Sequence, residues 1–161
     1  SQEFKLARCR KLNYAEIAKI ARDYFNEKFQ FASDFLLGAR YYAGLQKYKM
    51  ASFHLHQAAE NYLRTIPLVY ILYGYKDHAL EILMDRCKTH TLQLVSVFPR
   101  NTEEERRLFN LLQDAYVQAR YNKDFVVTKT DIDALIPRLE LMRDITEKVC
   151  CDRIAYYEQQ S

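Results

Sequence analysis

The sequence predicts an all-α fold, an antiparallel up-down helical bundle of four long helices plus one or two short helices. Apolar residues recur every three or four positions along most of the 161 residues, which is the spacing of helices that bury one face. The chain has only 3 Gly and 3 Pro, too few for the tight turns of a β-sandwich or barrel. We expect a basic, linker-like segment over residues 1–13 and the bundle domain over residues 14–158.

The first helix is predicted over residues 14–44. Asn13 and Glu16 have the spacing of a capping box at its start, and Gly44 marks its end. One face carries apolar residues along the whole length, and these are Tyr14, Ala18, Ala21, Phe25, Phe29, Ala32, Leu36, Ala39 and Ala43. This stripe predicts a helix packed along its full length against its neighbours.

A second helix is predicted over residues 48–73, ending at Gly74. Pro67 lies inside it, and because proline lacks a backbone N–H and crowds the preceding turn, we expect a kink near Leu63. The apolar positions are Ala51, Leu55, Ala58, Ala59, Tyr62, Leu63 and Ile66.

Two short helices are expected next. Asp77 is placed to cap one that runs to about Cys87, and Thr89 is placed to cap another that runs to Val97, before Pro99. Asp and Thr are favoured at helix starts because their side-chain oxygens accept hydrogen bonds from the first free backbone N–H groups.

Two more long helices complete the bundle. Thr102 and Glu105 form a capping box that opens the third, which ends before a loop over residues 122–129. Thr130 or Thr128 caps the last helix, in which Pro137 predicts a bend or a late start. The inward positions of the two are Leu108, Leu112, Ala115 and Ala119, then Ile132, Leu135, Leu139, Met142, Ile145 and Val149.

Composition limits the classes of function. The net charge of +3 is too weak by itself to indicate nucleic-acid binding. The four Cys show no C-x-x-C spacing, and the start of the sequence has no apolar signal-peptide core. No window is apolar enough to span a membrane, so we expect a cytoplasmic protein with reduced thiols and no membrane partner.

No local motif of a nucleophilic enzyme, zinc protease or phosphate-binding loop is present. His56 and Glu60 are spaced i, i+4, as two metal ligands on a helix would be, but Arg64 continues the same row. We therefore expect a row of charges and hydrogen bonds there, with no metal, no cofactor and no catalytic residues.

Three basic groups are candidates for phosphate contacts. One is the N-terminal set Lys5, Arg8, Arg10 and Lys11, which is explained more simply as a solvated or frayed terminus. Another is Arg86, Lys88 and His90, around the predicted start of the helix that Thr89 caps, where free backbone N–H groups favour anions.

The third basic group follows the helix that Thr102 opens. Arg120 and Lys123 suit the negative end of that helix, and Arg120 is also spaced to pair with Asp124. Alternatively, Arg120 presents its planar donors to a phosphate while Tyr121 stacks on a base.

Three segments together resemble the HEPN family. Phe53–Leu63 contains the H-Q-A-A-E signature of that family's second helix, Lys88–Leu92 is similar to its K-T-H-D-L segment, and Ala119–Tyr121 matches its A-R-Y segment. The resemblance spans about residues 14–150 in the right order. It implies a helical bundle that commonly forms homodimers and often accompanies a minimal nucleotidyltransferase domain in the same bacterial chain or operon.

The resemblance implies a non-catalytic module that binds the phosphate of a nucleotide or nucleic acid. The residues carried over are Arg120, Lys123, Lys88 and His90 as phosphate contacts, Tyr121 as a stacking surface, and Gln57 or Glu60 as hydrogen-bonding groups.

Two alternatives stay open, a purely structural oligomerisation domain and a metal-independent ribonuclease of the toxin type. RNA-cleaving members carry an Arg followed by four to six residues and a His, whereas no His follows Arg120, and only three residues separate Arg86 from His90. A ribonuclease would therefore need Arg86 with His90, or Arg120 with a histidine of a dimer mate.

Overall fold

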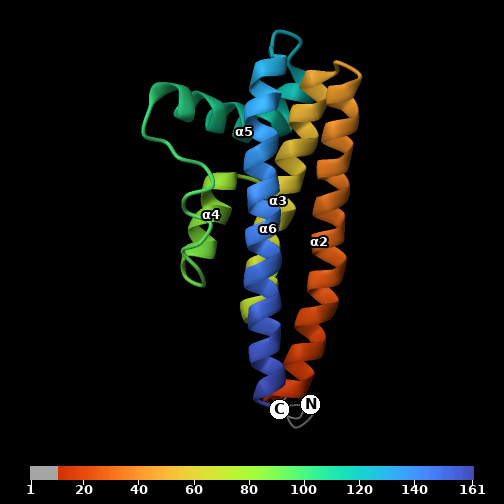
Figure 1. Ribbon diagram of the computed structural model, residues 1–161, viewed down its shortest axis with the longest axis vertical. Coiled ribbons are helices and arrows are strands. Elements are labelled where there is room, and N and C mark those ends of the chain that lie inside the picture. The colour runs from red at the N-terminus through yellow and green to blue at the C-terminus, as the bar shows by residue number, and fades with distance from the viewer. Residues whose placement is uncertain (1–10) are drawn as a thin grey trace, which may run out of the picture.

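The computed structural model describes residues 11–161, and in that range every regular element is an α-helix (Figure 1). The elements are α2 (Tyr14–Gly44), α3 (Tyr48–Ile71), α4 (Leu80–Lys88), α5 (Glu103–Tyr121) and α6 (Lys129–Gln159). The all-α prediction is confirmed. Most of the basic segment predicted over residues 1–13 lies outside the described residues. None of the described helices is long and apolar enough to cross a membrane.

The core is formed by α2, α3 and α6, which lie side by side, with α2 antiparallel to the other two (Figure 1). The fourth helix does not complete a simple up-down bundle, because α5 lies across the long helices and packs mainly on α3. Its buried side chains lie within about two turns, as a crossing helix requires, and they are Phe109, Leu111, Leu112 and Ala115. The up-down arrangement expected for α5 is therefore replaced by a crossing.

Helix starts follow the predicted caps. The Asn13 side chain accepts a hydrogen bond from the Glu16 N–H at 2.9 Å, and Thr102 and Glu105 form a complete capping box. Of the two threonines considered for α6, Thr128 is the cap, in a capping box with Asp131. The late start predicted from Pro137 is wrong, because α6 already begins at Lys129.

The predicted helix from Thr89 to Val97 is wrong. Residues 89–102 form turns, with hydrogen bonds from Val95 N to Leu92 O and from Val97 N to Leu94 O. The hydroxyl of Thr89 donates to the carbonyl of Arg86, at the end of α4, and so caps no following helix. Three buried side chains of this segment pack in the hydrophobic core and so hold the turns in place, and they are Leu94, Val97 and Phe98.

The ends of α3 and α4 differ from the predictions by a few residues. The helix α3 ends at Ile71, before the end predicted at Gly74, and Leu72, with φ of 56°, takes the left-handed conformation that closes it. The helix α4 starts at Leu80, and its N-cap residue is Ala79, which has no side-chain oxygen. The cap predicted at Asp77 is therefore wrong, and the Asp77 carbonyl accepts a hydrogen bond from Arg64.

Pro67 is accommodated by a contact between α3 and α4. Because proline has no N–H, the carbonyl of Leu63 has no helical donor, and the buried Cys87 thiol lies 3.2 Å from this oxygen. Burial raises the pKa of Cys87 to about 12, so the thiol keeps the proton that it donates. The helix α3 continues past Pro67 to Ile71.

A charged contact joins the starts of α5 and α6. Arg107 lies 2.6 Å from the buried Asp131 carboxylate and 2.7 Å from Glu104. Burial acts to raise the pKa of Asp131, but hydrogen bonds from Arg107 and Thr128 outweigh it, so the pKa is lowered. A group with a lowered folded pKa stabilises the fold above its unfolded pKa and loses this contribution as the pH falls.

Replacing Arg107 by Ala is expected to lower the free energy of unfolding by about 1 kcal/mol at pH 7, because Arg107 is half-exposed and partly screened. The difference from the wild type should shrink as the pH falls below about 4, where Asp131 becomes protonated in the unfolded chain and then in the fold. Urea unfolding at pH 7 and pH 3 measures both differences. An equal loss at the two pH values would contradict this assignment.

Candidate functional site at the contact of α3 and α5

Arg120 lies at the end of α5 among three aromatic rings. Its guanidinium carbon is 4.4 Å from the ring centre of Tyr116, 4.9 Å from that of Tyr121 and 5.3 Å from that of Phe53. Its Nε donates to the carbonyl of Tyr116 at 2.7 Å. Within residues 11–161 no carboxylate pairs with it, so the predicted pair with Asp124 does not form. An oriented, exposed guanidinium without a counter-ion is suited to binding an anion.

Further cations and a ring lie around the end of α5 and the loop that follows it. Lys49, in the first turn of α3, donates to the carbonyls of Asn122 and Lys123 at 3.2 and 3.4 Å and so fixes the loop. Lys123 is exposed, and three-quarters of the Tyr121 surface is accessible. Exposed rings beside cations provide stacking and charge together.

A buried carboxylate lies next to these rings. Glu60 of α3 is only 1% exposed, and its Oε1 is 2.6 Å from Nδ1 of His78 and 3.6 Å from the Arg64 guanidinium. Arg64 also donates to the carbonyl of Asp77 at 2.7 Å. Glu60 and Arg64 therefore hold the connection between α3 and α4 against α3.

His78 connects the Glu60 carboxylate to the aromatic rings around Arg120. Its ring stacks on Tyr116, with ring centres 4.7 Å apart and an angle of 15° between the planes, and about half of its side chain is exposed. Tyr116 thus contacts both His78 and Arg120. We call the cluster of side chains formed by Phe53, Glu60, His78, Tyr116 and Arg120 the α3–α5 site.

His56 and Gln57 lie beneath this site. His56 is fully buried, and burial lowers its pKa to about 4, so its ring is neutral at pH 7. Its Nδ1 is 3.2 Å from Oε1 of the half-buried Gln57, and its ring lies 5.2 Å from Tyr116. The i, i+4 row predicted from His56 to Arg64 therefore places hydrogen-bonding groups behind the rings, and the described residues contain no cluster of three metal-ligating side chains.

The structure divides the seven predicted residues between two places. Gln57, Glu60, Arg120, Tyr121 and Lys123 lie at or beside the α3–α5 site, whereas Lys88 ends α4 and His90 stacks on Tyr70 at 5.1 Å. Phe53 is near the start of α3 and Tyr70 near its end, which separates the places by about 25 Å.

His90, which stacks on Tyr70, therefore cannot share one phosphate with Arg120. Lys88 pairs with Asp85 at 3.1 Å, and burial, together with the charge of Arg153, lowers the pKa of His90. Lys88 is the last residue of α4 and His90 follows it, so neither opens a helix and the anion-binding helix start predicted for them is wrong.

Sequence reasoning missed His78, Tyr116, Phe53 and Lys49. Tyr116 precedes Arg120 by four residues, a spacing that brings side chains together on a helix and that would have found it. His78 lies in an irregular connection whose path no periodicity describes.

The fold and the site define an all-helical domain in which an exposed arginine packs among aromatic rings, and one of these rings stacks on a histidine that pairs with a buried carboxylate. A family model of the HEPN domain matches residues 25–149, and the chain belongs to the HEPN family. Members of this family are nucleotide-binding or ribonuclease-type modules. No curated protein gives a significant match to the sequence.

Proposed function

We propose that the chain is a non-catalytic module that binds the phosphate of a nucleotide or nucleic acid at the α3–α5 site. The observation that carries this proposal is the Arg120 guanidinium, which three rings hold in place and which has no acidic partner among the described residues. Its N–H groups bind the phosphate, Tyr121 offers a face to a base, and Lys123 adds positive charge.

Replacing Arg120 by Gln is expected to lower the affinity for ATP or GTP about ten- to a hundredfold, the usual effect of losing a hydrogen bond to a charged group. Calorimetric titration of the full chain at low salt measures this loss. The matched control is Arg100→Gln, because Arg100 also stacks on a ring, that of Phe109 at 4.5 Å, but belongs to another surface.

Two outcomes of this titration reject the proposal. One is a wild-type protein that binds neither nucleotide, and the other is an equal loss of affinity in the Arg120 and Arg100 variants. A large drop in the melting temperature of Arg120→Gln would instead mark Arg120 as a residue that stabilises the fold.

The proposal includes a homodimer and a cytoplasmic nucleotidyltransferase in the same chain or operon as partners. Support for self-association comes from apolar side chains of α2 that are exposed in the monomer, namely Tyr24, Phe31, Leu37 and Tyr41. If light scattering shows a dimer and the titrations show no nucleotide binding, the chain is a purely structural oligomerisation domain.

A ribonuclease is the second candidate, and the contact between Glu60 and His78 favours it. A buried carboxylate 2.6 Å from a half-exposed imidazole orients that ring as a general base, and Arg120 lies across Tyr116 from it, where it would stabilise charge on a phosphate.

RNA cleavage by the wild-type protein that is lost in His78→Asn but kept in His90→Ala would establish this activity. No cleavage of RNA by the wild type would remove it. The pair Arg86 and His90 is not favoured, since the two side chains stack on different rings, Tyr75 and Tyr70.

A further inference from the structure

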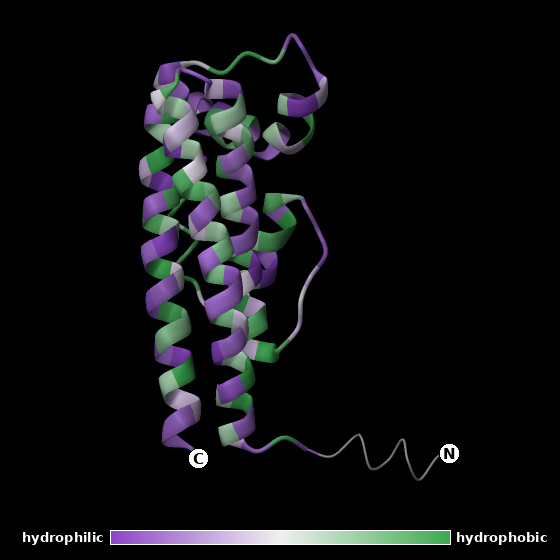
Figure 2. Cartoon of the chain, turned by 90° about the vertical axis from the view of Figure 1, so that its right-hand side faces the viewer, coloured by the Kyte–Doolittle hydropathy of each residue, from purple (hydrophilic) through white to green (hydrophobic). Residues whose placement is uncertain are grey.

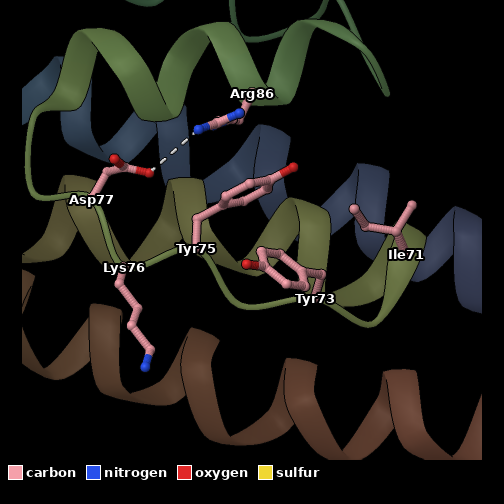
Figure 3. Close-up of a pocket in the computed structure, with 6 residues that line it drawn as sticks. All are labelled: Ile71, Tyr73, Tyr75, Lys76, Asp77 and Arg86. Atoms are coloured by element: carbon pink, nitrogen blue, oxygen red, sulfur yellow. Dashed lines mark ion pairs between the residues drawn. The ribbon is translucent and has the colours of Figure 1, made fainter.

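The connection between α3 and α4 borders an open depression that no part of the α3–α5 site lines. Figure 2 shows residues 72–79 as an extended segment outside the long helices, with hydrophilic residues in its second half. The depression has a volume of about 850 Å³, within the usual range for small-molecule sites. Its lining residues are Ile71, Tyr73, Tyr75, Lys76, Asp77 and Arg86 (Figure 3).

Arg86 is held in orientation but poorly neutralised. Its guanidinium carbon lies 4.4 Å from the ring centre of Tyr75, and its nearest carboxylate, that of Asp77, is 3.9 Å away (Figure 3). Arg22, by comparison, lies 2.6 Å from its acidic partner. At 3.9 Å the pair lacks a hydrogen bond, so the N–H groups of Arg86 remain able to bind an anion.

Flat apolar surface lies beside this cation. The Tyr73 ring stands nearly edge-on to that of Tyr75, with ring centres 4.8 Å apart, and 56% of Tyr73 is exposed. Ile71, which is 49% exposed, continues the surface away from Arg86 (Figure 3). Lys76 points away from Arg86, on the other side of the tyrosines, and so leaves Arg86 as the cation nearest the rings (Figure 3).

We propose that this depression binds a small aromatic anion, with its flat ring on Tyr73 and Ile71 and its phosphate beside Arg86. A ring bearing a phosphate matches the two features that lie side by side, because the tyrosine and isoleucine surfaces exclude water while the guanidinium binds two phosphate oxygens. Nucleoside monophosphates and simple aryl phosphates share this chemistry. The inference uses none of the residues of the proposed function.

The test is calorimetric titration of the full chain with AMP, phenyl phosphate and inorganic phosphate. We expect both ring-bearing probes to bind at least tenfold more tightly than inorganic phosphate. Tighter binding of AMP than of phenyl phosphate assigns the site to nucleoside phosphates, and the reverse order assigns it to aryl phosphates.

Two variants at exposed positions locate the binding. Arg86→Gln is expected to lower the affinity for both ring-bearing probes about ten- to a hundredfold. Tyr73→Leu is expected to lower their affinity to that of inorganic phosphate. Melting temperatures near that of the wild type show that both variants are folded, and Arg100→Gln is the matched control with unchanged affinity.

The inference is overturned if no probe binds, if inorganic phosphate binds as tightly as the ring-bearing probes, or if Arg86→Gln behaves as Arg100→Gln does. Loss of AMP binding in Arg120→Gln with unchanged binding in Arg86→Gln also overturns it, while leaving the proposed function intact. Loss of AMP binding in Arg86→Gln, with unchanged AMP binding in Arg120→Gln, supports the inference and assigns AMP to the depression rather than to the α3–α5 site.

Discussion

Replacing Ala58 by Asp is expected to unfold the domain. Ala58 is fully buried on α3, within the hydrophobic core of the domain. A carboxylate at this position has neither water nor a cation, so it costs several kcal/mol whether it remains ionised or takes up a proton. Domains of this size are stable by only about 5–15 kcal/mol, and the larger side chain also overpacks the core.

Circular dichroism and thermal unfolding test this expectation, with Ala15→Asp as the matched control. Ala15 is exposed in the first turn of α2, where a negative charge suits the helix dipole, so the control should unfold as the wild type does. A cooperative transition in Ala58→Asp within a few degrees of the wild type would contradict the packing described for α3.

Replacing Gly38 by Ala is expected to destabilise the domain, although alanine favours helices. A Cβ at position 38 would lie 2.8 Å from Cδ2 of His54 on α3. The His54 ring has little room to move, since its Nδ1 is 3.0 Å from the Met50 carbonyl and its ring packs on Tyr42 at 4.9 Å. The clash costs about 1–3 kcal/mol against a helix-propensity gain of about 1 kcal/mol.

Gly44→Ala provides the control, because nothing lies within 4 Å of a Cβ at that position. This variant should be as stable as the wild type or more stable, while Gly38→Ala melts at a lower temperature. Truncation of the ring in Gly38→Ala/His54→Ala should recover part of the loss relative to His54→Ala alone. Equal stability of the two single glycine variants would show that α2 and α3 are less closely packed than described.

The sequence predicts helices well where side chains accept hydrogen bonds from the free backbone N–H groups at the start of the helix. The caps at Thr102 and Thr128 act within a few residues, so their spacing is visible without tertiary information. The helix predicted from Thr89 fails because a segment this short has little helical stability of its own, and packing of Leu94 and Val97 decides its form. The crossing of α5 depends likewise on packing that the apolar spacing does not specify.

The candidate site was predictable only in part, for the same reason. Arg120 and Glu60 lie on regular helices, whose geometry gives the direction of each side chain. His78 reaches Glu60 through an irregular connection, and only the folded chain places the two at 2.6 Å. Lys88 and His90 were assigned to a helix start that does not exist.

Pro67 and Cys87 belong to one arrangement, although twenty positions of chain separate them. A residue with an N–H at position 67 would satisfy the Leu63 carbonyl from within α3 and leave the thiol without that acceptor. Substitutions at the two positions should therefore be tolerated together more readily than alone. We expect positions 67 and 87 to covary among relatives of this chain.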